Sequence, residues 1–281
     1  MTEKAPAPKA RRLTDRFGPI VWLAAVLGLW LALAGCESHK ESVALYRKAN
    51  SLWEGGQHID AARSFITISE IYPGSPLVED SLFWAANLYH HFLGNVPLAE
   101  RYYQQLMVRF PEGEHFHPSL EAVAELYAQE RETRYKAILT YRKLMLAEAV
   151  APRRDRYLLR IAEAYVGLGR LEEARFELRK LITQYRSSTL LPQAYYLAGY
   201  SYYWEGRKPL AVIALNQIGK DFPDEPIAVR ARFFVAEIYE EEGSLRKALE
   251  VYESLRGAYH NPTILDKRLE ALRARMNRSV R

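Results

Sequence analysis

The sequence predicts an all-α protein, an array of six helical hairpins followed by one capping helix. The first observation is an alanine that recurs six times, at intervals of 37 or 38 residues. These alanines are Ala61, Ala99, Ala137, Ala174, Ala211 and Ala248. An aromatic or aliphatic residue follows each of them after four positions and another after seven, which is the spacing of one helix face. The alanine therefore marks the second helix of each hairpin.

A second series of small residues, 12 or 13 positions upstream, marks the first helix of each hairpin. Its members are Ala49, Ala86, Ala124, Ala162, Gly199 and Ala236. A tyrosine follows three positions later in five copies, and Leu52 takes that place in the first copy. One hairpin of this length cannot bury its apolar face alone, so a repeat of this period predicts copies stacked on their neighbours.

The hairpin turns and the helix ends carry their own signals. A glycine stands five positions before the second-helix alanine in every copy except the third, which has Glu132. Glycine there permits the left-handed turn that ends the first helix. The second helices are expected to end at Tyr72-Pro73, Phe110-Pro111 and Phe222-Pro223, less regularly at Pro152 and Pro262, and without a proline near Tyr185.

The last segment, residues 263–281, is predicted to be a capping helix with a basic tail. Leu265, Leu269, Leu272 and Met276 have spacings of four, three and four, with charged residues between them. Such a helix covers the open end of a stack of repeats. Residues 42–262 are then the six repeats.

The combined pattern resembles the tetratricopeptide repeat, with a small residue, an aromatic three positions later, a turn glycine and an alanine. The clearest copy runs from Ala162 through Tyr165 and Gly169 to Ala174. The resemblance covers about residues 42–262 and implies a right-handed superhelical solenoid. It also implies a non-enzymatic scaffold that binds protein partners, because this repeat family typically presents a preformed surface to other proteins.

The first 35 residues are predicted to be a lipoprotein signal peptide. A basic segment is followed by an uncharged stretch from Phe17 to Gly35, and the run Leu33-Ala34-Gly35-Cys36 resembles a bacterial lipobox. That resemblance implies cleavage before Cys36 and covalent lipid, such as palmitate, on the only cysteine of the chain. Residues 36–41 would be the lipidated N-terminus and a short linker. The alternative is an uncleaved transmembrane helix, because a span needs about 20 residues.

The lipobox, the short linker and the repeats together resemble BamD-type outer-membrane lipoproteins. The resemblance implies a scaffold in the machinery that inserts β-barrel proteins, lipid-anchored on the periplasmic face of the outer membrane of a Gram-negative bacterium. Glu37 after the cysteine favours the outer membrane, since aspartate is the better-known signal for retention in the inner membrane. Lipoproteins of polysaccharide export, of pilus or secretion assembly and of cell-wall coordination remain alternatives, with glycan or peptidoglycan as the ligand.

The resemblance also implies a partner-binding groove along the first helices, at positions three before, one after and four after the small residue. The candidates for this groove are Tyr46, Asn50, Trp53, Phe83, Asn87, His90, Glu163, Tyr196, Tyr200, Tyr203, Phe233 and Glu237. Aromatic residues dominate both ends of the array, and carboxylates lie between them. Tyrosine and tryptophan anchor interfaces well. The alternative for any one ring is packing between neighbouring first helices.

Charge and motifs speak against several other functions. The signal segment accounts for +3 of the net charge of +5, which leaves about +2, too little for a nucleic-acid footprint. We expect no metal site and no cofactor beyond the lipid, since His90-His91 and His115-Phe116-His117 have no obvious further ligand. No nucleophile elbow or phosphate loop is present, so no enzyme is predicted. Arg153, Arg154, Arg156 and Arg160 form a basic cluster for lipid headgroups or an acidic partner, or a solvated face.

Overall fold

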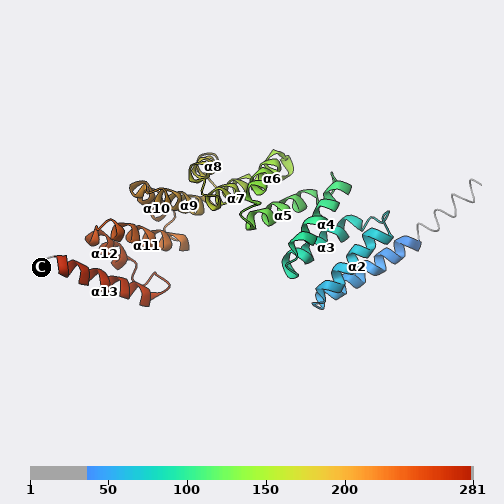
Figure 1. Ribbon diagram of the computed structural model, residues 1–281, viewed down its shortest axis with the longest axis horizontal. Helices are drawn as coiled ribbons and strands as arrows, with labels where there is room; N and C mark the ends of the chain where they lie inside the picture. Colours follow the sequence, from blue (N-terminus) through green and yellow to red (C-terminus); the bar gives the residue numbers. More distant parts are fainter. Residues whose placement is uncertain (1–36, 280–281) are drawn as a thin grey trace, which may run out of the picture. The chain divides into compact units, whose positions relative to one another are not determined.

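The computed structural model describes residues 37–279, and every regular element in that part of the chain is a helix (Figure 1). The all-α prediction is therefore confirmed. The chain divides into two compact units, with the boundary between Phe116 and His117. The predicted signal peptide and Cys36 lie outside the described residues. Within residues 37–279, no helix combines the length and the apolar character that crossing a membrane requires.

The first unit holds two hairpins. Its helices are 37–54, α2 (His58–Ile71), α3 (Val78–Asn87) and α4 (Val96–Arg109). The last turn of the α3 helix widens into a π-helix, η1 (Leu88–Phe92), which the sequence pattern did not predict. The chain is already helical at residue 37, within the segment 36–41 that the sequence predicted to be a linker. This segment has no proline or glycine to stop the helix from extending backwards.

The second unit holds four hairpins and the final helix. Its elements are α5 (Phe116–Gln129), α6 (Arg134–Leu146), the 3₁₀ helix η2 (Glu148–Arg153), α7 (Arg154–Gly167), α8 (Leu171–Gln184), α9 (Leu191–Trp204), α10 (Lys208–Asp221), α11 (Pro226–Glu241), α12 (Leu245–Ser254) and α13 (Pro262–Ser279). Pro152 lies inside η2 and Pro262 opens α13, so neither proline ends a second helix as expected.

The two series of small residues lie in the interior of the repeats. All eleven alanines of the two series are completely buried, and Gly199 is buried as well. The residues four positions after the second-helix alanines are at most 1% exposed, including Phe65, Tyr103 and Leu215. The repeat in the sequence is therefore a repeat of the core, and each copy buries the same face.

The turn glycines behave as the sequence predicts. Gly56, Gly94, Gly169, Gly206 and Gly243 have φ between 61° and 79°. No other residue type has a positive φ within residues 37–279, so Glu132 does not copy this turn.

The third hairpin closes its turn with side chains instead. Thr133 Oγ1 donates to the carbonyl of Tyr127 at 2.8 Å. Arg134 Nε donates to the carbonyl of Ala128 at 3.2 Å. These carbonyls at the end of α5 have no partner within the helix, and the two side chains satisfy them.

The ends of the second helices depend on the aromatic residue more than on the proline after it. Tyr72, Phe110 and Phe222, each followed by proline, have φ from −119° to −137° and ψ from 53° to 65°. Tyr185 lacks the proline and has nearly the same angles, −118° and 57°. In each case the backbone N–H of the aromatic residue donates to the carbonyl four positions earlier. The fourth copy therefore ends its second helix in the same way as the first, second and fifth copies.

The closeness of α9 and α10 leads to a stability prediction. A Cβ at Gly199 would stand 2.7 Å from Leu215 Cγ and 3.3 Å from the Ala211 carbonyl oxygen. We expect Gly199→Ala to lower the free energy of unfolding by about 1–3 kcal/mol, because overpacking outweighs the better helix propensity of alanine. Urea denaturation followed by circular dichroism measures the change.

Gly219→Ala in α10 is the matched control. A Cβ there comes no nearer than 3.4 Å, to Arg232 Nε, so the substitution should raise stability by up to about 1 kcal/mol. Equal effects of the two substitutions would show that helix propensity, and not the close approach, governs position 199.

Candidate functional site

In the first unit, the predicted groove residues are half-buried and lie against neighbouring rings. Trp53 packs on Trp84 with ring centroids 4.9 Å apart, and Tyr46 meets Phe65 edge-on at 5.3 Å. Phe83 stacks on His115 at 4.2 Å. Packing between elements therefore accounts for part of this aromatic character.

Two polar candidates of the first unit are also engaged within it. Asn87 Nδ2 donates to the carbonyl of Phe83, one turn back in α3. The imidazole of His90 stacks on that of His91 at 4.0 Å, and its Nδ1 is buried with no hydrogen-bond partner in the described part of the chain. Burial, followed by the neighbouring His91, lowers the pKa of His90 from 6.5 to about 4. A histidine of this kind packs as a neutral ring.

In the second unit, the basic cluster pairs with the carboxylates predicted for the middle of the groove. Arg153 donates to Glu121 at 2.7 Å, and the Tyr157 hydroxyl donates to the same carboxylate at 3.0 Å. Arg156 lies 3.3 Å from Glu125.

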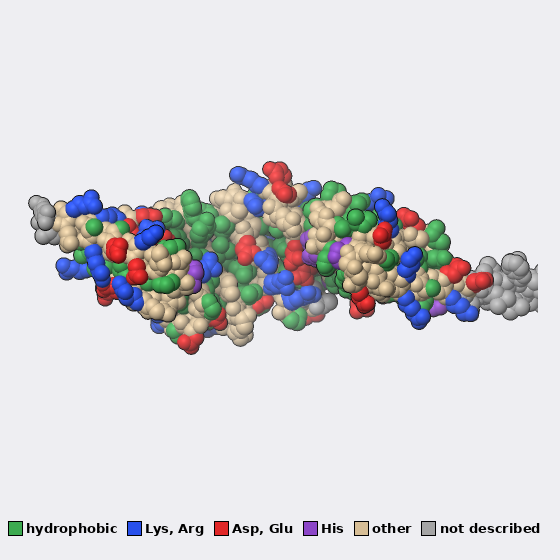
Figure 2. Space-filling view, turned by 90° about the horizontal axis from the view of Figure 1, so that it is seen from below, with side chains coloured by type: hydrophobic (Ala, Val, Ile, Leu, Met, Phe, Trp, Pro, Cys, Tyr) green, Lys and Arg blue, Asp and Glu red, His purple; other side chains and the backbone are tan. Residues whose placement is uncertain are grey.

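Arg160 bonds Glu163 at 2.9 Å within α7. In the face seen in Figure 2, acidic and basic side chains lie side by side instead of forming separate patches. The middle of the predicted groove is therefore close to charge balance.

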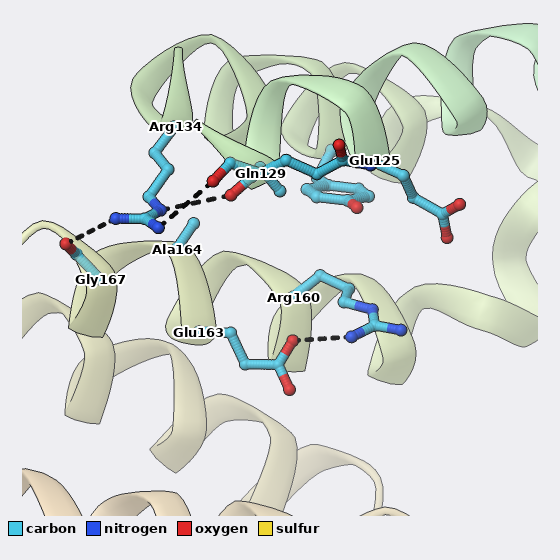
Figure 3. Close-up of a pocket in the computed structure, with 9 residues that line it drawn as sticks. Glu125, Gln129, Arg134, Arg160, Glu163, Ala164 and Gly167 are labelled. Atoms are coloured by element: carbon cyan, nitrogen blue, oxygen red, sulfur yellow. Dashed lines mark hydrogen bonds and ion pairs between the residues drawn. The ribbon is translucent and has the colours of Figure 1, made fainter. Parts of the chain in front are cut away.

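A hollow of about 460 Å³ between α5, α6 and α7 belongs to this charged region (Figure 3). Arg134 reaches from α6 to the backbone, and its Nη1 donates to the carbonyl of Gly167 at 2.9 Å. Glu125 and Glu163 line the same hollow as Arg134 and Arg160, so two negative charges face two positive ones. The guanidinium of Arg134 holds three helices together, and this arrangement is structural.

A different hollow, between α9 and α11, brings predicted groove residues together. We call it the aromatic recess; its volume is about 270 Å³, and its lining is Tyr196, Tyr200, Arg230, Phe233, Phe234, Glu237, Tyr259 and His260. Four of these residues, Tyr196, Tyr200, Phe233 and Glu237, are among the candidates that the sequence predicted. The fifth candidate of this region, Tyr203, lies beside the recess and packs on Phe234 at 5.0 Å.

The walls of the aromatic recess are fixed by contacts behind them. Phe233 stacks on Tyr259 with centroids 4.4 Å apart and an interplanar angle of 6°. The hydroxyl of Tyr203 donates to Glu241 at 2.7 Å. Arg230 lies over the ring of Tyr196 at 5.4 Å. The recess therefore presents ring faces that are already held in place.

Glu237 is the acidic group of the aromatic recess. Burial raises the pKa of its carboxyl group, although the Arg268 guanidinium, 3.3 Å from Oε1, opposes this shift. A half-buried carboxylate beside aromatic rings is a strong acceptor for a donor on a bound ligand.

Four residues of the aromatic recess are not among the candidates that the sequence predicted, namely Arg230, Phe234, Tyr259 and His260. Arg230 and Phe234 lie on α11 but outside the three positions taken as groove positions, and Tyr259 and His260 lie in the turn before α13. Phe234 could have been suspected from the sequence, because it directly follows the predicted groove residue Phe233. Within residues 37–279, no group of three or more His, Cys, Asp or Glu side chains is arranged to hold a metal ion.

Comparison with known proteins identifies the kind of repeat. The family model described as a tetratricopeptide repeat matches residues 80–113, 156–188 and 193–225. These segments cover most of the hairpins α3–α4, α7–α8 and α9–α10. No match to the chain is found among curated protein sequences.

Solved structures agree with the fold. A tetratricopeptide repeat protein from Parabacteroides merdae is 17% identical with a TM-score of 0.60, and the similarity covers 85% of this chain and 88% of that one. The C-terminal part of a repeat protein from Cytophaga hutchinsonii is 16% identical with a TM-score of 0.57, covering 75% and 77%. PilW, described as a widely conserved type IV pilus biogenesis factor, is 13% identical with a TM-score of 0.53, covering 77% and 93%.

The fold and these matches define the class of the molecule. The described chain has the fold of tetratricopeptide repeat proteins, and three of its segments match that repeat; proteins with this fold typically serve as scaffolds for protein partners and not as catalysts. At this level of identity, the similarity to solved structures establishes the fold alone.

The low pKa of His90 leads to a prediction for pH dependence. Below about pH 6.5 the unfolded chain binds a proton at this residue, while the folded chain does not bind it until about pH 4. We therefore expect His90 to contribute a loss of stability as the pH falls from about 6.5 to about 4, and His90→Gln to reduce the pH dependence in this window. Urea midpoints of the full chain at several pH values measure it.

Ser51→Ala, at an exposed residue of the first unit that does not titrate, is the control and should leave the pH dependence as in the parent protein. The same pH dependence in the parent and in His90→Gln would contradict the assignment.

Proposed function

We propose that this protein is a non-enzymatic scaffold that binds a protein partner through the aromatic recess between α9 and α11. One observation carries the proposal. Residues that the repeat register assigns to the groove, on two consecutive first helices, line one hollow together with an arginine, a glutamate and a histidine. Ring faces with a polar rim are the composition of interface hot spots.

The size of the aromatic recess favours one side chain of a longer ligand. Its volume of about 270 Å³ is below the range of about 300–1,000 Å³ that pockets for small molecules usually have. Flat tyrosine and phenylalanine faces suit an aromatic or proline side chain, while Arg230 and Glu237 are placed to bond the polar groups of the same peptide. Because the rings are held by their neighbours before binding, little conformational entropy is lost when the partner docks.

The first test removes two ring faces. Tyr196→Ala combined with Tyr200→Ala should weaken capture of the partner by at least about thirtyfold, which corresponds to about 2 kcal/mol. Crosslinking in intact cells, detergent extraction and quantitative mass spectrometry measure which proteins are lost from the double variant. Tyr135→Ala, at an exposed tyrosine on α6 away from the recess, is the matched control.

Two results would contradict the proposal. One is an unchanged set of partners when the double variant is folded. The other is binding of a purified peptidoglycan or polysaccharide fragment that depends on Tyr196 and Tyr200, because it would make the ligand a glycan.

We further propose that the mature protein is anchored by lipid on Cys36 at the periplasmic face of the outer membrane. The support is the lipobox-like sequence and the position of the only cysteine within it. Two or three acyl chains are enough for durable attachment. The pathway that we propose is outer-membrane protein assembly, in the manner of BamD. Pilus or secretion assembly, polysaccharide export and cell-wall coordination are the alternatives, and the proteins recovered by crosslinking decide among them.

The anchor has its own test. Cys36→Ser should abolish incorporation of labelled palmitate and leave the precursor uncleaved at residue 35. Mass spectrometry of the membrane fraction measures both changes. A parent protein that carries no lipid, or one that keeps residues 1–35 in the membrane, would favour the transmembrane alternative.

A further inference from the structure

Helix α9 borders a second hollow on a different face, between α8 and α10. We call it the α8–α10 groove; its volume is about 520 Å³. Its apolar lining includes Leu178, Ile182, Tyr195, Tyr202, Ile213 and Ala214. Tyr195 and Tyr202 lie about 130° around the helix axis from Tyr196 and Tyr200, at 100° per residue. The groove is therefore distinct from the aromatic recess.

The composition of α9 indicates that both of its faces are made to be covered. Six of its 14 residues are aromatic, namely Tyr195, Tyr196, Tyr200, Tyr202, Tyr203 and Trp204. A helix with one face in solvent normally carries charged residues there, and α9 has none. On the side of the α8–α10 groove, the described chain leaves part of this surface open.

The rim of the α8–α10 groove also exposes aliphatic surface. Ile213 on α10 is 64% exposed, while Ile182 on α8 is half-buried. Covering apolar surface of this kind contributes about 25 cal/mol per Å². The groove thus offers a hydrophobic driving force for a partner that fits between α8 and α10.

The charge of the α8–α10 groove favours a partner with negatively charged side chains. Two arginines and no acidic residue line it. Arg175 is already engaged, since its Nη2 contacts both carboxylate oxygens of Glu205 at 2.7 and 2.8 Å and its guanidinium lies over Tyr202. Arg179, one turn further along α8, has no acidic partner within residues 37–279. A carboxylate on the partner would complete this pair.

The backbone of the groove selects the conformation of the partner. The α8–α10 groove is walled by helices, whose backbone groups are bonded internally, so an extended peptide finds almost no partners for its own N–H and C=O groups. A helical peptide already satisfies its backbone N–H and C=O groups with hydrogen bonds inside the helix. α8 and α10 have 14 residues each, about 21 Å at 1.5 Å per residue, which is enough for three to four turns of a further helix.

We propose that the α8–α10 groove docks an amphipathic α-helix of a protein partner, with apolar side chains on Ile182, Tyr195 and Ile213 and a carboxylate on Arg179. The apolar residues of this helix would have spacings of three, four and seven. This surface is independent of the aromatic recess, so the protein would hold two partners through one helix.

The test uses a phage library of random 16-residue peptides selected on the immobilised full chain. We expect enriched peptides with apolar residues at helical spacing and at least one Asp or Glu. Fluorescence anisotropy of labelled enriched peptides should show at least a tenfold loss of affinity for Ile213→Asp and for Arg179→Glu. Circular dichroism of each variant checks that it is folded.

Two matched variants control for the substitutions themselves. Ile264→Asp places the same charge at an exposed isoleucine on α13, and Arg186→Glu reverses a charge after the end of α8. Both should bind within twofold of the parent. The proposal is overturned by selection without enrichment, by peptides that lack helical spacing or carry basic residues instead, or by affinities that neither groove variant changes.

Discussion

The burial of two small residues in each hairpin, one on each helix, is the constraint on which the rest of the structure depends. An alanine or glycine of the first helix and an alanine of the second are both fully buried in all six copies. Short side chains let the two backbones approach, and this approach decides which face of each helix is inside. Because this buried pair recurs every 37 or 38 residues, the outward positions recur as well. The surface that the repeats offer to a partner is thus set by the register of the core.

The parts of the fold that could be predicted are those whose causes are local in sequence. The buried alanines and the aromatic residues four positions later follow from helical spacing, and turn glycines such as Gly169 follow from backbone sterics. The third turn could not be derived in this way, because Arg134 replaces the glycine through bonds to carbonyls of α5 and of α7, more than 30 residues away. The predicted end of the third copy's second helix at Pro152 was wrong, because α6 ends earlier, at Leu146. A proline shows only that a helix cannot continue past it, and the helix can end before that point.

The same distinction between local and long-range causes applies to the candidate site. Tyr196, Tyr200, Phe233 and Glu237 could be predicted because each occupies a fixed position relative to the small residue of its own helix. The pairing of Arg153 with Glu121 could not, since it joins residues 32 positions apart and depends on how neighbouring hairpins are offset. The α8–α10 groove was missed for the same reason. It is a space between second helices, and no pattern within one helix encodes the width of that space.

The two proposed binding surfaces meet at α9, and the exception in its sequence explains why. At Gly199 the first-helix series loses its alanine, and Leu215 of α10 fills the room that a Cβ would need. Phe234 of α11 contacts the rings of Tyr196, Tyr200 and Tyr203. Aromatic packing therefore holds this face of α9 against α11. On the other side, Tyr195 and Tyr202 line the α8–α10 groove and pack, like Tyr196 and Tyr203, against the core that α10 and α11 share. Since the recess is lined from α9, α11 and the turn before α13, and the groove from α8, α9 and α10, partners on the two sides would cover different side chains.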